Sequence, residues 1–116
     1  SSKPTGFDIT REDQLRYVNW LIKQAHGRGL AIGQKNATEL VPDLVDQMDF
    51  ALLESAHRLG FMDEFDPYVA QGKPVFAVEY VDDGADAAAF CPAADRQGFQ
   101  GVIARTELDH APQNCP

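Results

Sequence analysis

A single glutamate, Glu54, stands at the end of an apolar run and is the residue best placed for chemistry in this sequence. The run covers residues 49–54, after which the chain becomes polar. An acid that ends a buried strand occupies the place where catalytic groups occur in (β/α) folds, although hydrolysis of sugars normally needs two acids. Glu54 could instead cap a following helix. The pattern alone leaves both interpretations open.

Polar residues also end three other apolar runs. The runs at residues 30–36, 74–80 and 101–107 close on Lys35 and Asn36, on Glu79 and Tyr80, and on Arg105. Because the carboxyl ends of parallel strands gather at one edge of a sheet, we expect these side chains to lie near Glu54. Glu79 has an equally good structural interpretation, as a partner of Lys35 or Arg105.

The spacing of apolar residues predicts four helix–strand units. The strands are expected at residues 30–36, 49–54, 74–80 and 101–107, followed by an irregular tail. The helices are expected at residues 10–27, 37–47, 61–73 and 85–98, with Pro92 breaking or starting a segment. This alternation favours an α/β fold with a parallel sheet covered by helices, as in a TIM barrel. A flavodoxin-like sandwich is the alternative, but no glycine-rich phosphate loop follows any strand.

Size and charge exclude several classes of function. The chain has 116 residues, 44% of them hydrophobic and 24% charged, which is typical of one globular domain. Its formal charge of −8 argues against nucleic acid or an anionic membrane surface as a partner, since both require a basic patch. The apolar runs are far shorter than the ~20 residues of a membrane span.

The sequence contains no recognisable metal or cofactor motif. Its three histidines lie in separate segments and lack metal-ligand spacing. The acidic residues at 82, 83 and 86 lack the glycine and glutamate of a calcium loop, so we interpret them as a solvated turn. We therefore expect neither a metal nor a cofactor.

Two cysteines, Cys91 and Cys115, allow one pairing. From the residues alone they are either unrelated thiols or a disulfide that ties the C-terminal tail to the segment of the last helix. A disulfide would imply an oxidising compartment.

Four blocks of sequence, together with the strand that ends at Glu54, resemble a known family. They are TGFDIT (5–10), YVNWLIKQAHGRGLAIGQKN (17–36), GKPVFAVEY (72–80) and FCPAADRQGF (90–99). The pattern resembles glycoside hydrolase family 114, the endo-α-1,4-polygalactosaminidases, over nearly the whole chain. This resemblance implies a TIM barrel and cleavage of galactosamine or N-acetylgalactosamine polysaccharide by two carboxylates.

The resemblance also implies a role for each matching residue. Glu54 matches one of the family's two catalytic acids, and we expect it to be a general acid/base whose pKa is raised by its apolar strand and by carboxylate neighbours. The expected substrate-binding residues are Lys35, Asn36, Glu79, Tyr80 and Arg105. The two cysteines match a family pair, which implies a disulfide and a secreted or cell-surface protein.

Two departures from the family pattern bear on activity. Leu53 replaces the usual asparagine before the catalytic glutamate, and a family cysteine pair falls on Ala56 and Met62. In addition, the family's second catalytic acid, an aspartate, belongs to a segment before the TGF block, and this chain starts at Ser1. We therefore expect residues 1–116 to be the C-terminal half of the domain, units five to eight, with the second acid upstream.

Three hypotheses of different classes follow. The chain is part of an endo-glycosidase, or it is a carbohydrate-binding pseudoenzyme, or it is a barrel half that pairs with a partner half or with itself. A half-barrel would expose sheet edges and an apolar face, which favours association.

Overall fold

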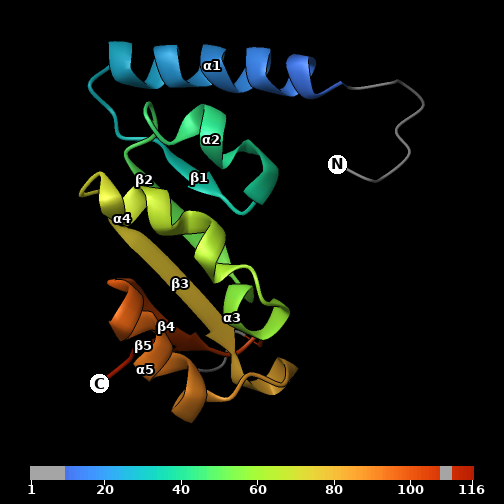
Figure 1. Cartoon of the computed structure of the whole chain (residues 1–116), viewed down its shortest axis with the longest axis vertical. Helices are drawn as coiled ribbons and strands as arrows, with labels where there is room; N and C mark the ends of the chain where they lie inside the picture. Colours follow the sequence, from blue (N-terminus) through green and yellow to red (C-terminus); the bar gives the residue numbers. More distant parts are fainter. Residues whose placement is uncertain (1–9, 108–110) are drawn as a thin grey trace. The chain divides into compact units, whose positions relative to one another are not determined.

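The computed structural model of this chain describes residues 10–107 and 111–116 and divides into two compact units, Ser1–Ala31 and Ile32–Pro116. Within the described residues the first unit contains helix α1 (Arg11–Gly27) (Figure 1). A capping box begins it, because Thr10 Oγ1 accepts from the Asp13 N–H at 3.1 Å and Asp13 Oδ2 accepts from the Thr10 N–H at 3.3 Å. The predicted helix start is thus confirmed, while residues 5–9 of the TGFDIT block lie outside the described residues.

The second unit is built on a five-stranded sheet with the strand order β1-β2-β3-β4-β5. The strands are β1 (Gly33–Lys35), β2 (Phe50–Glu54), β3 (Val75–Tyr80), β4 (Gln100–Ala104) and β5 (Gln113–Asn114). The first four strands are parallel, and β5 is antiparallel to β4. Parallel strands that alternate with helices confirm the predicted fold class.

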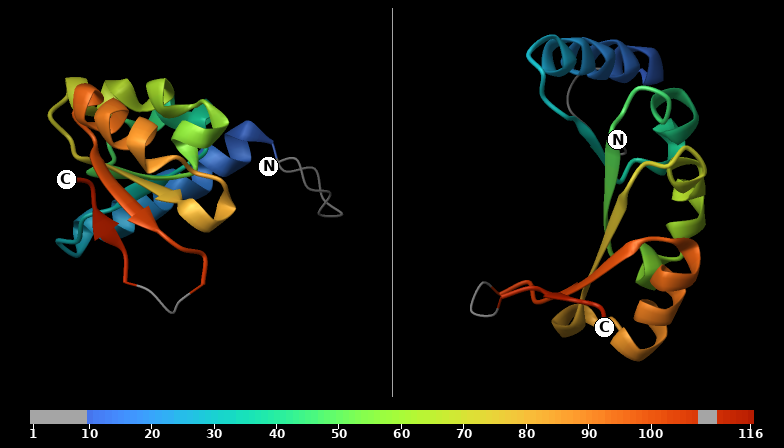
Figure 2. Two further views of the ribbon diagram at one scale, coloured as in Figure 1. Left: turned by 90° about the horizontal axis from the view of Figure 1, so that it is seen from below. Right: turned by 90° about the vertical axis from the view of Figure 1, so that its left-hand side faces the viewer.

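Short helices connect the parallel strands. They are η1 (Thr38–Leu40) and α2 (Val41–Leu44) after β1; α3 (Ala56–Leu59), η2 (Met62–Phe65) and α4 (Asp66–Ala70) after β2; and η3 (Val81–Asp83) and α5 (Ala87–Gln97) after β3. Helices α2 to α5 lie on one face of the sheet (Figure 2).

The two faces of the sheet therefore differ in burial. The helix-covered face carries side chains that are at most 1% exposed, namely Ala51, Leu53, Val75, Ala77 and Glu79. Residues between them point to the opposite face, where Glu54 and Tyr80 are partly exposed and Phe76 is 38% exposed. Because side chains alternate along a strand, Glu79 and Tyr80 point to opposite sides of the sheet.

The helices differ from the prediction in two respects. Helix α3 was not predicted, because four residues between Ser55 (φ 59°) and Gly60 (φ 82°) are too few to show a helical period. Pro92 does not break or start a segment but lies inside α5. That helix continues across the proline, with Phe90 and Ala94 buried on either side of it.

The tail after β4 was predicted to be irregular, but it includes strand β5. Cys91 and Cys115 form a disulfide that links α5 to the residue after β5, and the Cys115 N–H donates to the Gly101 carbonyl at 2.9 Å. A Cβ at Gly101 would lie 2.6 Å from Cys115 Sγ, so this contact requires glycine. The disulfide implied by the family resemblance is therefore present, and it holds the tail against the sheet.

No helix within residues 10–107 or 111–116 is both long enough and apolar enough to cross a membrane.

Candidate active site

Glu54 lies at the carboxyl end of β2 between side chains from the two neighbouring strands. Its Oε1 is 2.5 Å from Lys35 Nζ, at the end of β1, and its Oε2 accepts a hydrogen bond from the Tyr80 hydroxyl, at the end of β3, at 2.6 Å. The three residues meet because their strands are adjacent, parallel and end at the same edge. Both carboxylate oxygens of Glu54 are thus bound.

These contacts control the protonation of Glu54. The hydrogen bonds from Lys35 and then Tyr80 lower the pKa of the Glu54 carboxyl below its ordinary 4.5. Desolvation acts in the opposite direction but is outweighed, because the side chain is 30% exposed and faces a cation. The predicted rise in pKa was therefore wrong. Donation to Glu54 in turn raises the pKa of Tyr80 to about 12, so an ionised carboxylate faces a neutral phenol at neutral pH.

The side chain of Asn36 binds the main chain of Glu54. Its Oδ1 accepts the Glu54 N–H at 3.0 Å. Asn36 (φ 48°) and Ala37 (φ 57°) both adopt the left-handed conformation, which costs a residue other than glycine on the order of 1 kcal/mol. The end of β1 is thus a strained turn, and strained turns of this kind are concentrated at functional sites.

A groove of about 340 Å³ lies beside Glu54, within the size range of ligand sites. Its lining consists of Asn36, Ala37, Thr38, Glu39, Glu54, Leu59 and Phe61. Leu59, which is 62% exposed, and Phe61 offer apolar surface, whereas Asn36, Thr38 and Glu39 offer polar groups. The sequence analysis did not predict five of these residues, and only their closeness to the strand ends at 36 and 54 could have indicated them; they are Ala37, Thr38, Glu39, Leu59 and Phe61.

Glu79 is placed away from this groove. Its side chain is on the helix-covered face, 1% exposed, and accepts the backbone N–H groups of His57 and Arg58 at 3.1 Å each. Of its two predicted interpretations, the structural one holds with other partners, because Glu79 binds the backbone of α3 and Lys35 binds Glu54. Glu79 anchors the start of α3, directly after the strand that carries Glu54.

Arg105 is also separated from Glu54, because it follows β4 and β3 lies between β4 and β2. It lines a different cavity, of about 290 Å³, together with Val81, Ile103, Ala104, Ala111 and Gln113. The structure thus brings Lys35, Asn36 and Tyr80 to Glu54, and places Arg105 elsewhere on the strand-end edge.

The acidic turn after β3 is exposed to solvent at Asp82, Asp83 and Asp86, as predicted, and it is also tied to its neighbours. Asp82 accepts both the N–H and the hydroxyl of Thr106, at 3.0 and 2.6 Å for the nearer contacts, and these bonds lower the pKa of Asp82. Asp83 pairs with Arg58 at 3.2 Å. The loops at the ends of β2, β3 and β4 are therefore connected through side chains.

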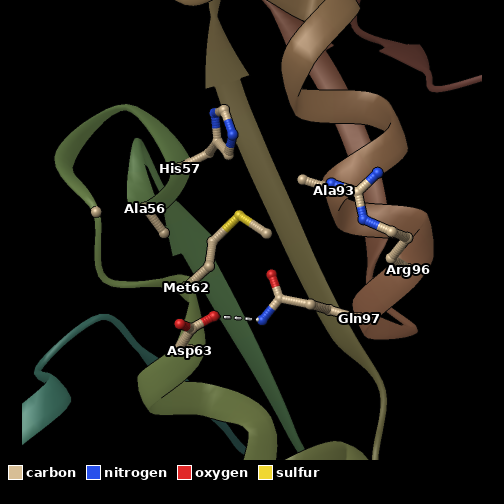
Figure 3. Close-up of a pocket in the computed structure, with 8 residues that line it drawn as sticks. Ala56, His57, Met62, Asp63, Ala93, Arg96 and Gln97 are labelled. Carbon is tan, nitrogen blue, oxygen red and sulfur yellow. Dashed lines mark hydrogen bonds between the residues drawn. The ribbon is translucent and has the colours of Figure 1, made fainter.

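A further cavity, of about 380 Å³, lies between the α3–η2 segment and α5 (Figure 3). Its lining consists of Ala56, His57, Gly60, Met62, Asp63, Ala93, Arg96 and Gln97. Gln97 Nε2 spans one side of it by donating to Asp63 Oδ1 at 2.9 Å. The cavity contains none of the residues predicted to bind substrate. Across residues 10–107 and 111–116, no group of three or more His, Cys, Asp or Glu side chains could hold a metal ion.

Comparison with known proteins connects this site to a family. No curated protein matches the chain. Among solved structures, the crystal structure of Aspergillus fumigatus Ega3 in complex with galactosamine matches with a TM-score of 0.85 and 28% sequence identity. The match covers 97% of this chain and 49% of the Ega3 chain, so the chain spans about half the length of Ega3. Its β/α units correspond to a fragment of a TIM barrel. The model of glycoside-hydrolase family GH114 matches residues 1–116, and the chain therefore belongs to that family.

Proposed function

We propose that this chain supplies Glu54 as one of two catalytic carboxylates of an endo-acting glycosidase. The proposed substrate is an α-1,4-linked galactosamine or N-acetylgalactosamine polysaccharide, and the active unit is the complete barrel. The observation that carries the proposal is the ionised Glu54, held by Lys35 and Tyr80 beside a groove with polar and apolar walls. Membership of GH114 and the galactosamine complex of Ega3 support the substrate class.

The bound state of Glu54 bears on its role. Hydrolysis of a glycosidic bond needs one acid to protonate the leaving oxygen and one carboxylate to attack the sugar or to activate water. With Lys35 and Tyr80 in contact, Glu54 is ready to act as a base or nucleophile. To act as the general acid, Glu54 must first take up a proton, which requires a weaker contact with Lys35. We place the second carboxylate in the other half of the barrel, with residues 1–116 as the C-terminal half.

The decisive experiment compares the natural protein carrying this sequence with its Glu54→Gln variant on α-1,4-galactosamine oligomers. The substitution keeps the side-chain shape and removes the charge, so we expect turnover to fall about a thousandfold. Glu64→Gln, the same chemical change at an exposed position, is the control. Unchanged cleavage by Glu54→Gln would exclude Glu54 from catalysis.

The open sheet face supports a second candidate, a non-catalytic barrel fragment or carbohydrate-binding pseudoenzyme that needs a complementing half. Phe76 is 38% exposed on that face and packs edge-on against Phe50 with ring centroids 6.1 Å apart. Exposed apolar surface of this kind favours association. Size-exclusion chromatography with light scattering tests this candidate, and a stable monomer that melts cooperatively would contradict it.

We also propose that the protein is secreted or exposed at the cell surface. The Cys91–Cys115 disulfide supports this location, since disulfides persist mainly in oxidising compartments.

A further inference from the structure

A buried polar pair, Gln34 and Tyr68, lies beneath the turn that carries Asn36. Gln34 is 3% exposed and Tyr68 is 0% exposed, and the Tyr68 hydroxyl donates to Gln34 Oε1 at 2.6 Å. Gln34 belongs to β1, whereas Tyr68 belongs to α4 in the helical layer. Neither residue contacts Glu54 in the site described above, so the pair has no direct part in the chemistry.

The amide of Gln34 is fully engaged. Its Nε2 donates to the carbonyl oxygens of Asn36 at 2.9 Å and Ala37 at 2.8 Å. Because Tyr68 supplies a hydroxyl donor to Oε1, the amide is fixed with its NH₂ group toward these two carbonyls. Tyr68 thus determines the direction in which Gln34 binds the backbone.

The two carbonyls belong to the two consecutive left-handed residues of the turn. This conformation is uncommon for residues other than glycine, although asparagine tolerates it better than alanine, and two such residues in succession persist only where surrounding contacts hold them. The same turn directs Asn36 Oδ1 to the Glu54 N–H at 3.0 Å and places Ala37 in the wall of the groove.

We propose that Gln34 and Tyr68 are positioning residues of the active site, which hold the Asn36–Ala37 turn in the shape that orients Glu54 and forms one wall of the groove. This inference rests on the proposed function. The buried pair connects α4 to the end of β1, so a hydrogen bond from the helical layer controls the geometry of the turn beside Glu54.

Three variants of the natural protein test the proposal. Gln34→Met removes the amide at similar volume and leaves the Tyr68 hydroxyl buried without its acceptor. Tyr68→Phe removes the hydroxyl but keeps the ring, which stacks on Phe65 with centroids 6.1 Å apart. The double variant, Gln34→Met with Tyr68→Phe, lacks both polar groups, and replacing both partners of a buried hydrogen bond avoids most of the penalty of an unsatisfied group.

The double variant should therefore recover stability without recovering activity. We expect the double variant to have a higher denaturation midpoint than Gln34→Met, while its kcat on galactosamine oligomers stays about tenfold below wild type. The Glu54 N–H should also exchange with solvent faster in all three variants. Val75→Ala, a buried change at the opposite end of β3, is the control for lost stability and should keep wild-type kcat.

Either of two results would overturn the proposal. One is a double variant with wild-type kcat, which would mean that activity follows stability alone. The other is unchanged exchange of the Glu54 N–H in the variants. If the wild-type protein cleaves no galactosamine polymer, the proposed function fails, and the exchange measurement by itself then decides whether the pair holds the turn.

Discussion

Replacing Glu79 by glutamine should destabilise the protein without changing its affinity for substrate. The Glu79 carboxylate is 1% exposed and accepts two backbone N–H groups, those of His57 and Arg58, at 3.1 Å each. A glutamine has one oxygen, so it can accept one of these N–H groups while its NH₂ group opposes the other.

The magnitude follows from the number of hydrogen bonds lost. An unsatisfied buried donor costs about 1–3 kcal/mol, and a hydrogen bond to a charged group contributes about 1.5–3 kcal/mol. The neutral amide recovers part of this loss, because a buried amide is easier to desolvate than a carboxylate. We expect the free energy of unfolding to fall by about 2 kcal/mol.

Urea denaturation at pH 7 measures this change. Glu64→Gln, at an exposed site, is the matched control and should alter the free energy of unfolding by less than about 0.5 kcal/mol. In conditions where the Glu79→Gln variant is folded, its KM for galactosamine oligomers should equal that of the wild type. The side chain faces away from the groove, and the amide oxygen still binds one N–H of α3, the helix whose Leu59 lines the groove.

The opposite outcome would refute this reasoning. If Glu79→Gln kept its full stability while KM rose severalfold, Glu79 would be a substrate ligand, and its position on the helix-covered face would not describe the active protein.

Two further predictions concern charge and the disulfide. Lys35→Met should raise the pKa of Glu54 toward its ordinary 4.5, so the acidic limb of the kcat/KM profile should move to higher pH. A carboxyl whose pKa is lowered in the folded state stabilises the fold above pH 4.5. It loses that contribution as the pH falls through the lowered pKa. The difference in unfolding free energy between pH 7 and pH 3 should therefore be smaller in Lys35→Met than in the wild type. Because the Lys35 side chain is 62% exposed, the shrinkage should be about 0.5 kcal/mol, and an unchanged profile would argue against the Lys35–Glu54 contact. Replacing both Cys91 and Cys115 by alanine opens a loop with a sequence separation of 24, and the free energy of unfolding measured in urea should fall by about 3 kcal/mol. Reduction of the wild type should have the same effect. Equal stability with and without reductant would indicate that the disulfide does not form.

Much of the candidate site could be predicted because it depends on local sequence. Apolar runs ending in polar residues identified the ends of β1, β2 and β3, and the adjacency of parallel strands then predicted that polar side chains at the ends of β1 and β3 would lie near Glu54. The start of α1 could also be predicted, because a capping box forms between a threonine and an acid three residues later and needs no contact with the rest of the chain.

Other features could not be predicted because they depend on which groups face one another. Alternation along β3 requires Glu79 and Tyr80 to point in opposite directions, but only the position of the helices decides which of the two reaches Glu54. The pKa of Glu54 depends on a balance between burial and the Lys35 contact, and sequence pattern suggested only the burial.

The sequence by itself determined the order of helices and strands, the strand ends that carry polar residues, and the resemblance to a glycosidase family. These properties depend on the spacing of apolar residues and on short motifs, which involve only residues that are close in sequence. Only the tertiary structure decided that Lys35 and Tyr80 lower the pKa of Glu54, that Glu79 binds the backbone of α3, and that Gln34 binds both Tyr68 and the Asn36 carbonyl. Each of these results depends on contacts between residues about 20 to 35 positions apart, which form only when strands and helices pack.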